Sequence, residues 1–389
     1  MRYPVFPYFS VALVMGVGLS ILGPSVSHLE GKLGVSTSMM SLLFAVGAGC
    51  NLVGALVSGR FMNRFGGHHL LIVGVFGIGI GVLLICVGSL FAVVALGMSM
   101  AGAGSALADT GVNTLTVWAR AGEAGPSLNA LHLMFGVGAF LAPLSVDRSL
   151  AWVGGLWPTA VFVAILLAVS FSMLVTHDEP PHPDAAQVEV RPHIPRGAVA
   201  VVALFFLLYV GAEVAFGGWI HTYAEDVGLE GSRPALVTAV FWAAFSLGRL
   251  VAIPVSSRIR PLPLVSGACA LSVVGLVIIV VGRGDQSAVW TGTALYGLSS
   301  GPQYPTMLAL VDSRLSLTPT ATGYIVAAAG LGALVFPTVV GPLLDRVGSG
   351  AMPALVLTVT ASAAVWVLMV RRAVNRASAL SRTDVLRPA

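Results

Sequence analysis

Long apolar runs, each bounded by charged residues or by clusters of Pro and Gly, dominate the chain. Because a helix needs about 20 apolar residues to cross a hydrocarbon core about 30 Å thick, runs of this length predict transmembrane helices. The first run has no small-residue cleavage site, so we interpret it as a retained helix rather than a signal peptide. The pattern predicts an all-α membrane protein with twelve transmembrane helices, at 8–29, 36–59, 69–88, 90–118, 126–146, 154–176, 198–223, 234–257, 262–282, 287–311, 319–343 and 351–371.

The connection at 177–197 divides these spans into six and six. Its prolines and charges, beginning with HDEPPHP, exclude a spanning helix and favour a semi-rigid linker. The segment GAFLAP at 138–143 recurs as GALVFP at 332–337, which is 194 residues later. Two parallel six-helix halves are typical of the major facilitator fold. We therefore expect an N-terminal half at 1–176, a cytoplasmic linker at 177–197, a C-terminal half at 198–375 and a cytoplasmic tail at 376–389.

The composition narrows the function classes. Of 389 residues, 57% are hydrophobic and 9% are charged, whereas an ordinary soluble chain has about 25% charged residues. These values exclude a soluble enzyme, a disordered protein and a basic nucleic-acid binder. The sequence has no GxxxxGK[ST] nucleotide loop and no His and Cys cluster with metal-ligand spacing. We therefore expect no enzyme activity, no cofactor and no bound metal.

The distribution of Lys and Arg predicts the orientation. With both termini and the 177–197 connection in the cytoplasm, the cytoplasmic segments hold fourteen of these residues and the opposite loops hold five. This excess agrees with the positive-inside rule. We expect a multi-pass monomer of the inner or plasma membrane with both termini cytoplasmic, whose partners are the lipid bilayer and a small solute.

Ionisable residues inside the spans are candidates for function, because each costs at least about 2.5–3.5 kcal/mol at the centre of a bilayer. Asp109 shares one helical face with Ser105, Asn113 and Thr116. A carboxyl group removed from water favours its neutral form, so we interpret Asp109 as the site of cation or proton coupling. The alternative is a hydrogen-bonded packing seam between helices. The deep ionisable residues are Asp109, His132, Glu213 and Arg249.

Polar and aromatic residues at similar depth are candidates for a substrate site. Aromatic rings beside Glu213 suit a ligand with apolar ring faces and hydroxyl edges, such as a sugar, although Glu213 could instead pair with Arg249. His132 could equally be a hydrogen-bonded core residue. Pro302 and Pro305 free backbone carbonyls in the expected helix 287–311, and broken helices at the midplane are where transporters hold substrates. The predicted substrate contacts are Asn113, Asn129, His132, Tyr209, Glu213, Trp242, Tyr296, Gln303 and Tyr304.

Two charged segments are candidates for gating. Residues 59–68, GRFMNRFGGH, form an expected loop that matches the G-x-x-x-D-R-x-G signature of major facilitators, except that Asn63 replaces the acid. This replacement removes the charge on which a contact between the halves would depend. A second charged pair ends the expected helix 319–343. The predicted gating or structural residues are Arg60, Asn63, Arg64, Arg249, Asp345 and Arg346.

Six segments resemble one branch of the major facilitators, the sodium-dependent glucose transporter family. They are ILGP at 21–24, DTGxN at 109–113, ALHxxFGxGAFLAP at 130–143, GAEVAFGGW at 211–219, GRLxxIP at 248–254 and PTMLA at 305–309. The family is similar to the fucose–proton symporters, whose fourth helix carries an acid four residues before an Asn, as Asp109 and Asn113 do. The resemblance implies hexose uptake driven by Na⁺ or H⁺. The symporters' second acid, in the first helix, has no counterpart before Glu30.

The leading hypothesis is therefore secondary active transport of a monosaccharide by alternating access. The alternative is a drug or lipid exporter, a proton antiporter on the same fold. Exporters usually carry a GPxxGG element in the fifth helix, which 136–143 lacks, and their cavities are more apolar than the polar faces of 90–118 and 287–311 predict. A receptor would need a signalling domain larger than the 177–197 connection.

Overall fold

The computed structural model describes residues 3–120, 124–181, 196–315 and 319–385, which are helical apart from short connections. The first half contains α1 (Phe6–Ser20), α2 (Leu22–Leu33), α3 (Thr37–Phe65), α4 (Gly67–Val87), α5 (Phe91–Ala119), α6 (Gly125–Val153) and α7 (Trp157–Thr176). The second half contains α8 (Arg196–Asp226), α9 (Arg233–Ser256), α10 (Pro261–Gly282), α11 (Gln286–Ser300), α12 (Gln303–Leu315), α13 (Pro319–Val347) and α14 (Ala351–Val385). Most of the linker expected at 177–197 lies outside the described residues.

Each expected span corresponds to a helix or to a broken helix pair. Within the described residues, ten helices are long and apolar enough to cross a membrane, and the pair α1 and α2, bent by 44°, adds an eleventh. The run at 287–311 is occupied by α11 and α12, of 15 and 13 residues, which are separated by Gly301 and Pro302. The prediction of an all-α membrane protein is confirmed.

The loop expected at 59–68 is largely helical, so this prediction is wrong. α3 continues to Phe65, and α4 begins at Gly67. Residues 60–65 contain no Gly or Pro to end the helix. The first such position is Gly66, whose φ of 90° ends α3 in a conformation that glycine adopts readily.

Proline accounts for both broken spans. Pro24 has no N–H with which to bond the carbonyl of Ser20, and α1 ends at Ser20. In the second half, Pro305 likewise cannot bond the carbonyl of Gly301, which lies between α11 and α12. Both breaks therefore leave backbone carbonyls without their usual helical partners in the interior of the bundle.

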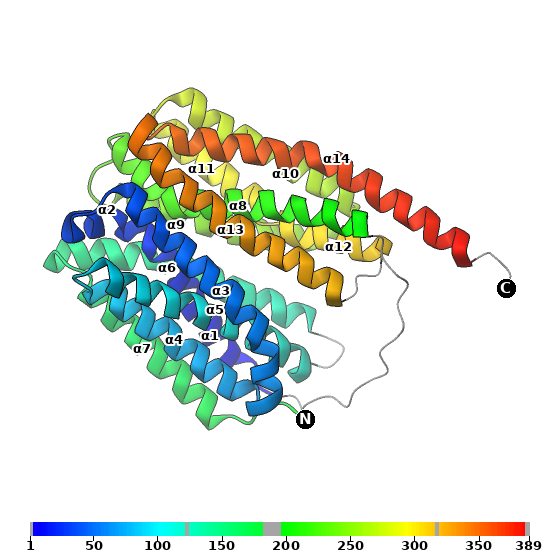
Figure 1. The fold of residues 1–389 in the computed structure, drawn as a ribbon, viewed down its shortest axis with the longest axis horizontal. Helices are drawn as coiled ribbons and strands as arrows, with labels where there is room; N and C mark the ends of the chain where they lie inside the picture. Colours follow the sequence, from blue (N-terminus) through cyan, green and yellow to red (C-terminus); the bar gives the residue numbers. More distant parts are fainter. Residues whose placement is uncertain (1–2, 121–123, 182–195, 316–318, 386–389) are drawn as a thin grey trace.

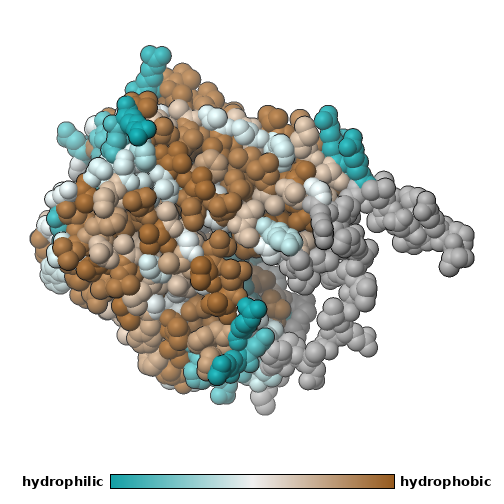
Figure 2. Space-filling model, in the orientation of Figure 1, coloured by the Kyte–Doolittle hydropathy of each residue, from teal (hydrophilic) through white to brown (hydrophobic). Residues whose placement is uncertain are grey.

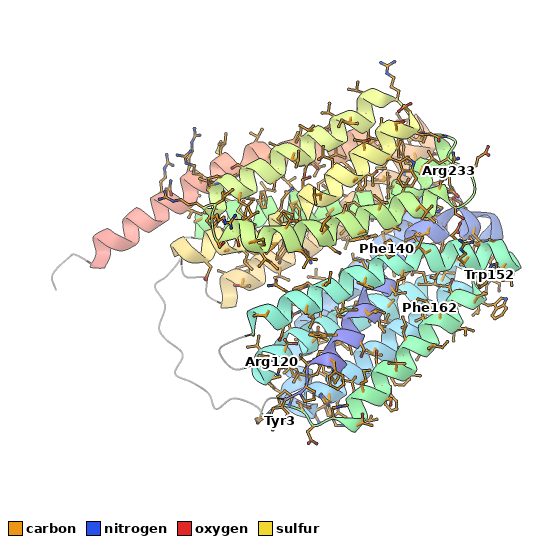
Figure 3. All side chains as sticks on the ribbon, turned by 180° about the vertical axis from the view of Figure 1, so that it is seen from behind. Tyr3, Arg120, Phe140, Trp152, Phe162 and Arg233 are labelled. Atoms are coloured by element: carbon orange, nitrogen blue, oxygen red, sulfur yellow. The ribbon has the colours of Figure 1, made fainter. Side chains whose placement is uncertain are left out.

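The helices form an elongated bundle (Figure 1). α1 begins and α14 ends at one end, here called the terminal end, and the opposite end is called the distal end. Figure 3 shows Tyr3 and Arg120 at the terminal end and Trp152 and Arg233 at the distal end. Arg120 Nη1 donates to the carbonyl of Tyr3 at 2.6 Å, which ties the end of α5 to the start of the chain. Hydrophobic residues cover most of the face in Figure 2, as a lipid-facing surface requires.

The two halves pack their helices in the same way. A Cβ atom at Gly138 of α6 would lie 2.0 Å from the carbonyl oxygen of Leu13 in α1. A Cβ atom at Gly332 of α13 would lie 2.0 Å from the carbonyl oxygen of Leu207 in α8. Gly332 and Leu207 both follow their counterparts by 194 residues. The repeat in the sequence therefore corresponds to one helix contact made twice, at an approach that only glycine permits.

The halves approach closely at the distal end and diverge toward the terminal end. Along the contact between α3 and α13, a Cβ atom at Gly341 would lie 2.5 Å from Ser41, near the distal end. Nearer the middle, the closest atoms to the Cβ positions of Gly49 and Gly330 are 3.7 and 3.6 Å away. The separation between the halves therefore increases toward the terminal end.

Candidate functional site

A cavity of about 630 Å³, here called the vestibule, lies between the halves toward the terminal end. The first half contributes α5 and α6 to its wall, and the second half contributes α9, α10 and α12. Because both halves line it, a solute there would contact both at once. The vestibule brings together six of the predicted residues: Asp109, Asn113, Asn129, His132, Arg249 and Tyr304.

Asp109 lies deep in the bundle, yet its side chain is exposed to the vestibule. Nδ2 of Asn113 donates to Asp109 Oδ1 at 3.0 Å and to the Asp109 carbonyl at 2.9 Å. Within the described residues, no side chain donates to the second carboxylate oxygen. That oxygen can therefore accept a proton or contact a cation. Thr116 of the same helical face is fully buried and lines neither this cavity nor the next.

Arg249 connects the vestibule to the break between α11 and α12. Its Nε donates to the carbonyl of Gly301 at 3.3 Å, which is the carbonyl that Pro305 leaves unpaired. Its guanidinium lies 4.5 Å from the centroid of the Phe245 ring, at the range of a cation–π contact. Arg249 therefore stabilises the broken helix as well as lining the cavity.

Glu213 does not form the direct pair with Arg249 that the sequence left open. Over the described ranges, no ion pair joins the two side chains. Glu213 is half-buried and lines neither of the two cavities described here. Tyr209, one turn earlier in α8, donates its hydroxyl to the carbonyl of Ser300 at 2.9 Å. The carbonyl of Ser300, beside the break, therefore also accepts a hydrogen bond from a side chain in the core of the second half.

Two further predicted substrate ligands, Tyr296 and Gln303, lie inside the second half. Tyr296 is 2% exposed and packs against the ring of Phe216, at 4.6 Å between centroids. The Gln303 amide donates to Ser272 Oγ at 2.7 Å, and its Oε1 accepts from Cys269 Sγ at 3.2 Å. In this conformation the Gln303 side chain is paired within the second half rather than exposed to either cavity.

A second cavity of about 190 Å³, here called the central pocket, lies distal to the vestibule. α5 contributes Ser105 to the pocket and Asp109 to the vestibule. α9 likewise contributes Trp242 to the pocket and Ser246 to the vestibule. Residues four apart are one helical turn apart, so about one turn separates the two cavities along both helices. As far as the described residues define it, the central pocket is lined by no ionisable side chain.

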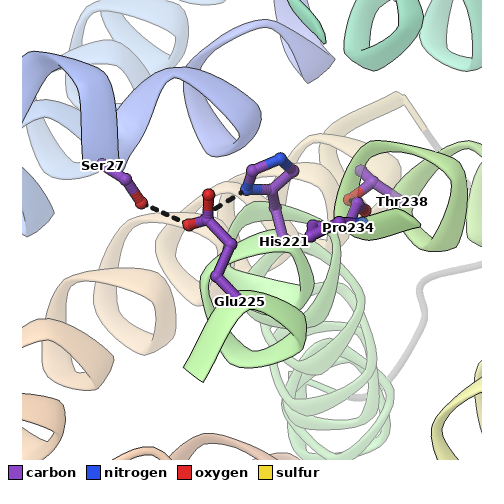
Figure 4. Close-up of polar contacts among 5 residues, drawn as sticks. All are labelled: Ser27, His221, Glu225, Pro234 and Thr238. Carbon is purple, nitrogen blue, oxygen red and sulfur yellow. Dashed lines mark hydrogen bonds and ion pairs between the residues drawn. The ribbon is translucent and has the colours of Figure 1, made fainter. Parts of the chain in front are cut away.

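Two hydrogen-bonded contacts join the halves at the distal end. Asp345, in the last turn of α13, accepts from the backbone N–H of Ser38 at 2.9 Å and from its hydroxyl, in the first turn of α3. Glu225 of α8 accepts from the hydroxyl of Ser27 in α2, and lies 3.5 Å from His221 Nδ1 (Figure 4). The distal end is therefore closed by contacts between the halves.

The predicted gating residues at the terminal end of α3 make no such contact in this conformation. Arg60, Asn63 and Arg64 are exposed, and the Arg64 guanidinium lies 5.2 Å from the ring centroid of Phe65. Among the described residues, no hydrogen bond or ion pair joins these three side chains to the second half. Arg346 is likewise exposed, whereas its neighbour Asp345 contacts α3.

Sequence reasoning missed Ser20 and Ser38. Ser20 lines the central pocket and precedes Pro24 by four residues, so the proline was the available signal for a special position there. Ser38 follows Ser36, whose hydroxyl accepts from Met39 N at 3.3 Å and caps α3. The capping pattern marks the start of α3, but the partner of Ser38 lies 307 residues away and leaves no local signal.

Over the described residues, no group of His, Cys, Asp or Glu could hold a metal ion.

Comparison with known proteins places these features in a family. The sequence model of the Major Facilitator Superfamily matches residues 8–337. The chain is 26% identical over 376 residues to sodium-dependent glucose transporter 1A of Mus musculus, covering 86% of this chain and 88% of the mouse protein. It is 22% identical over 375 residues to sodium-dependent glucose transporter 1 of Homo sapiens, covering 86% and 72%. Major facilitator superfamily domain-containing protein 4A of Danio rerio is 30% identical over 141 residues, covering 36% of this chain and 27% of the fish protein.

Proposed function

The chain belongs to the major facilitator superfamily and is a membrane transporter rather than an enzyme, and from this premise we propose that it carries a hexose-like sugar in symport with H⁺ or Na⁺. The observation that carries the proposal is the exposed carboxylate of Asp109 on the wall of a cavity shared by both halves. The names of the mouse and human relatives support sugar as the solute.

The shape of the cavity supports transport by alternating access. The vestibule lies toward the terminal end, while contacts of Asp345 and Glu225 with the first half close the distal end. Rocking the two halves would open the distal end and close the terminal end around the same solute. With the termini in the cytoplasm, as the Lys and Arg distribution favours, this conformation faces inward.

Asp109 is suited to couple this movement to an ion. Closing the vestibule would remove its carboxylate from water, and a buried unpaired charge is strongly unfavourable. A proton or a sodium ion on the free carboxylate oxygen would cancel the charge. Asn113, which holds the other oxygen at 3.0 Å, would keep the carboxylate in place as the ion binds and leaves.

One observation favours the exporter as a second candidate. Apart from a few polar groups, the central pocket is lined by apolar side chains that include Leu19, Phe44 and Met98. Such a lining also suits an apolar drug or lipid. The two functions differ in the solute and in the direction of ion flow, so one reconstituted assay distinguishes them.

The test is counterflow of labelled D-glucose in proteoliposomes, followed by uptake against a pH or a sodium gradient. We expect counterflow without a gradient and accumulation with one of the two gradients. Absence of counterflow for every sugar tested, together with proton-driven efflux of an apolar dye, would favour the exporter instead.

The Asp109→Asn variant tests the coupling role within the same assay. It keeps the shape and the contact with Asn113 but removes the ionisable group, so gradient-driven accumulation should fall at least tenfold while counterflow persists. Asp178→Asn is the matched control, because Asp178 is an exposed acid that lines neither cavity. Accumulation by Asp109→Asn at the wild-type level would exclude Asp109 from coupling.

A further inference from the structure

One exposed face of α14 changes from apolar to basic along its length. Val365 and Leu368 are 63% and 54% exposed. Arg371 and Arg372, one turn nearer the terminal end, are also exposed, and so is Arg376 one turn further on. Residues three and four apart lie on the same face of a helix, so these side chains form one continuous stripe. Figure 2 shows hydrophilic surface on this part of α14, beside the hydrophobic surface of the bundle.

The change from apolar to basic falls at the depth of a membrane surface. α14 begins with Ala351 near the distal end, and Arg371 follows 20 residues later. At about 1.5 Å per residue this separation is about 30 Å, which equals the thickness of a hydrocarbon core of about 30 Å. The guanidinium groups of Arg371 and Arg372 therefore lie at the level of lipid headgroups, and Leu368 lies at the level of the acyl chains.

Contacts with the second half fix the direction in which this face points. Trp366 Nε1 donates to the carbonyl of Val201 in α8 at 2.8 Å. Val367, Val370 and Val374 are at most 2% exposed and pack in the core of the second half. Because these contacts hold the other side of α14, the helix cannot rotate to turn its basic stripe inward.

The arginines of the stripe have no acidic partner. The sequence contains no acid between Arg346 and Asp384, so no ion pair can form one turn away along α14. Among the residues that the structure describes, no hydrogen bond or ion pair involves Arg371, Arg372 or Arg376. Like charges one turn apart on a helix are unfavourable, so an anion bound between them would stabilise this face.

Arg371 and Arg372 line a groove that is apolar at one end and polar at the other. The groove has a volume of about 350 Å³, and its remaining lining residues are Leu368 and Asn375. Leu368 lies about one turn before the arginines, toward the hydrocarbon, and Asn375 about one turn after them, toward water. A guanidinium group presents its N–H donors in a fork that matches the oxygens of a phosphate. This arrangement suits a molecule that carries a phosphate and an acyl chain better than it suits a free ion.

We propose that this face of α14 binds an anionic phospholipid, with Arg371 and Arg372 contacting the headgroup phosphate and Leu368 contacting an acyl chain. The site is separate from the proposed transport function, because it lies on the lipid-facing side of the second half and outside both cavities. Basic side chains beside a membrane attract anionic lipids. A zwitterionic lipid carries the same phosphate but adds a cation, which the unpaired arginines repel, so the site selects headgroups with a net negative charge.

The experiment counts bound lipids by native mass spectrometry of the protein in detergent, titrated with phosphatidylglycerol or with phosphatidylcholine. We expect one phosphatidylglycerol to bind about tenfold more tightly than phosphatidylcholine. Arg371→Gln and Arg372→Gln should each weaken its binding about fivefold, and the double variant should weaken it more than tenfold. The matched control is the double variant Arg258→Gln with Arg260→Gln. It removes the same charge from the exposed connection between α9 and α10, at the same end of the bundle, and should leave the affinity unchanged.

Several results would overturn the inference. Equal affinities for the two lipids would show that the net charge of the headgroup is not recognised. An unchanged affinity in the α14 double variant, or an equal loss in the control, would indicate diffuse attraction to basic surface instead of a site. Displacement of the lipid by inorganic phosphate would assign the groove to a free anion, and dimers that lack the lipid would assign it to a second copy of the chain. The comparison of lipids and the phosphate competition use the wild type, so they test the inference even if a variant fails to fold.

Discussion

Replacing Asp345 should open the distal end of the protein. Its carboxylate accepts two hydrogen bonds from Ser38, one of them from a backbone N–H at the start of α3 at 2.9 Å. The first N–H groups of a helix have no partner within the helix, and a negative charge there also interacts favourably with the helix dipole. Asp345→Ala removes both bonds and the charge, and therefore destabilises only the conformation in which α3 and α13 meet.

The size of the effect follows from these two bonds. A hydrogen bond contributes about 0.5–1.5 kcal/mol net, and Asp345 is exposed, so the lower part of that range applies to each. The loss is then about 1–2 kcal/mol. Since about 1.4 kcal/mol is a factor of ten in an equilibrium constant, the ratio of distal-open to distal-closed protein should rise about five- to thirtyfold. Ser38→Ala keeps the backbone N–H and should produce about half of this free-energy change.

The assay measures how fast a cysteine in the central pocket is modified from the distal side. Ala48 lines the pocket, so Ala48→Cys, in a background in which Cys50, Cys86 and Cys269 are replaced, reports distal opening. A charged maleimide is added to intact cells, where the distal end faces outward in the proposed topology. Its reaction rate is proportional to the distal-open population while that population is small, so Asp345→Ala should raise the rate by the factor above.

Asp147→Ala is the control for this experiment. Asp147 also precedes an Arg near the distal end of its helix, α6, but among the described residues no hydrogen bond or ion pair joins it to the second half. The double variant Ser38→Ala with Asp345→Ala should react no faster than Asp345→Ala alone, because both remove the same contact. An unchanged rate in Asp345→Ala, or an equal rise in Asp147→Ala, would refute the closing role of this contact.

Two further predictions concern stability. Gly138→Ala and Gly332→Ala should each lower the free energy of unfolding by about 1–3 kcal/mol, measured as thermal midpoints in detergent, because each new Cβ would lie 2.0 Å from a carbonyl oxygen of the neighbouring helix. Gly267→Ala, whose Cβ would have nothing within 4 Å, should not be destabilised. Arg249→Gln should lower the thermal midpoint by losing the bond to the Gly301 carbonyl, at about 1–3 kcal/mol, and Arg249→Lys should not restore it, because an ammonium group lacks the Nε donor.

The helices and the ionisable residues that line the vestibule could be predicted because their signals are local and energetically large. A span needs about 20 apolar residues whatever its neighbours are, so the runs alone predicted where each helix lies. An ionisable residue inside a span is costly, which is why Asp109, His132 and Arg249 were found and do line the vestibule. Pro302 and Pro305 marked the break between α11 and α12 for an equally local reason.

Which neighbouring helix or cavity a neutral polar residue contacts could not be predicted in this way. The polar face of 287–311 was predicted to contact the substrate, but Ser299 and Gln303, on either side of the break at Gly301 and Pro302, both hydrogen-bond Ser272 of α10. Both residues are buried inside the second half rather than lining a cavity, an outcome that could not be predicted because the sequence does not show which neighbouring helix a polar face meets. Thr116 lies on the same helical face as Asp109 but is buried. Residues on one helical face can contact different neighbours because they lie at different depths.

The separation of the two cavities has a physical consequence for coupling. A carboxylate in direct contact with the solute would be partly compensated by the hydroxyl groups of the sugar, so the protein could close without an ion. Asp109 lies about one helical turn from Ser105 of the central pocket, and a neutral sugar held there would leave its charge uncompensated. Closure of the loaded protein would then still require a proton or a cation at Asp109, since burying the bare carboxylate remains unfavourable. If the solute binds in the central pocket, its distance from the Asp109 carboxylate would therefore make transport depend on the ion.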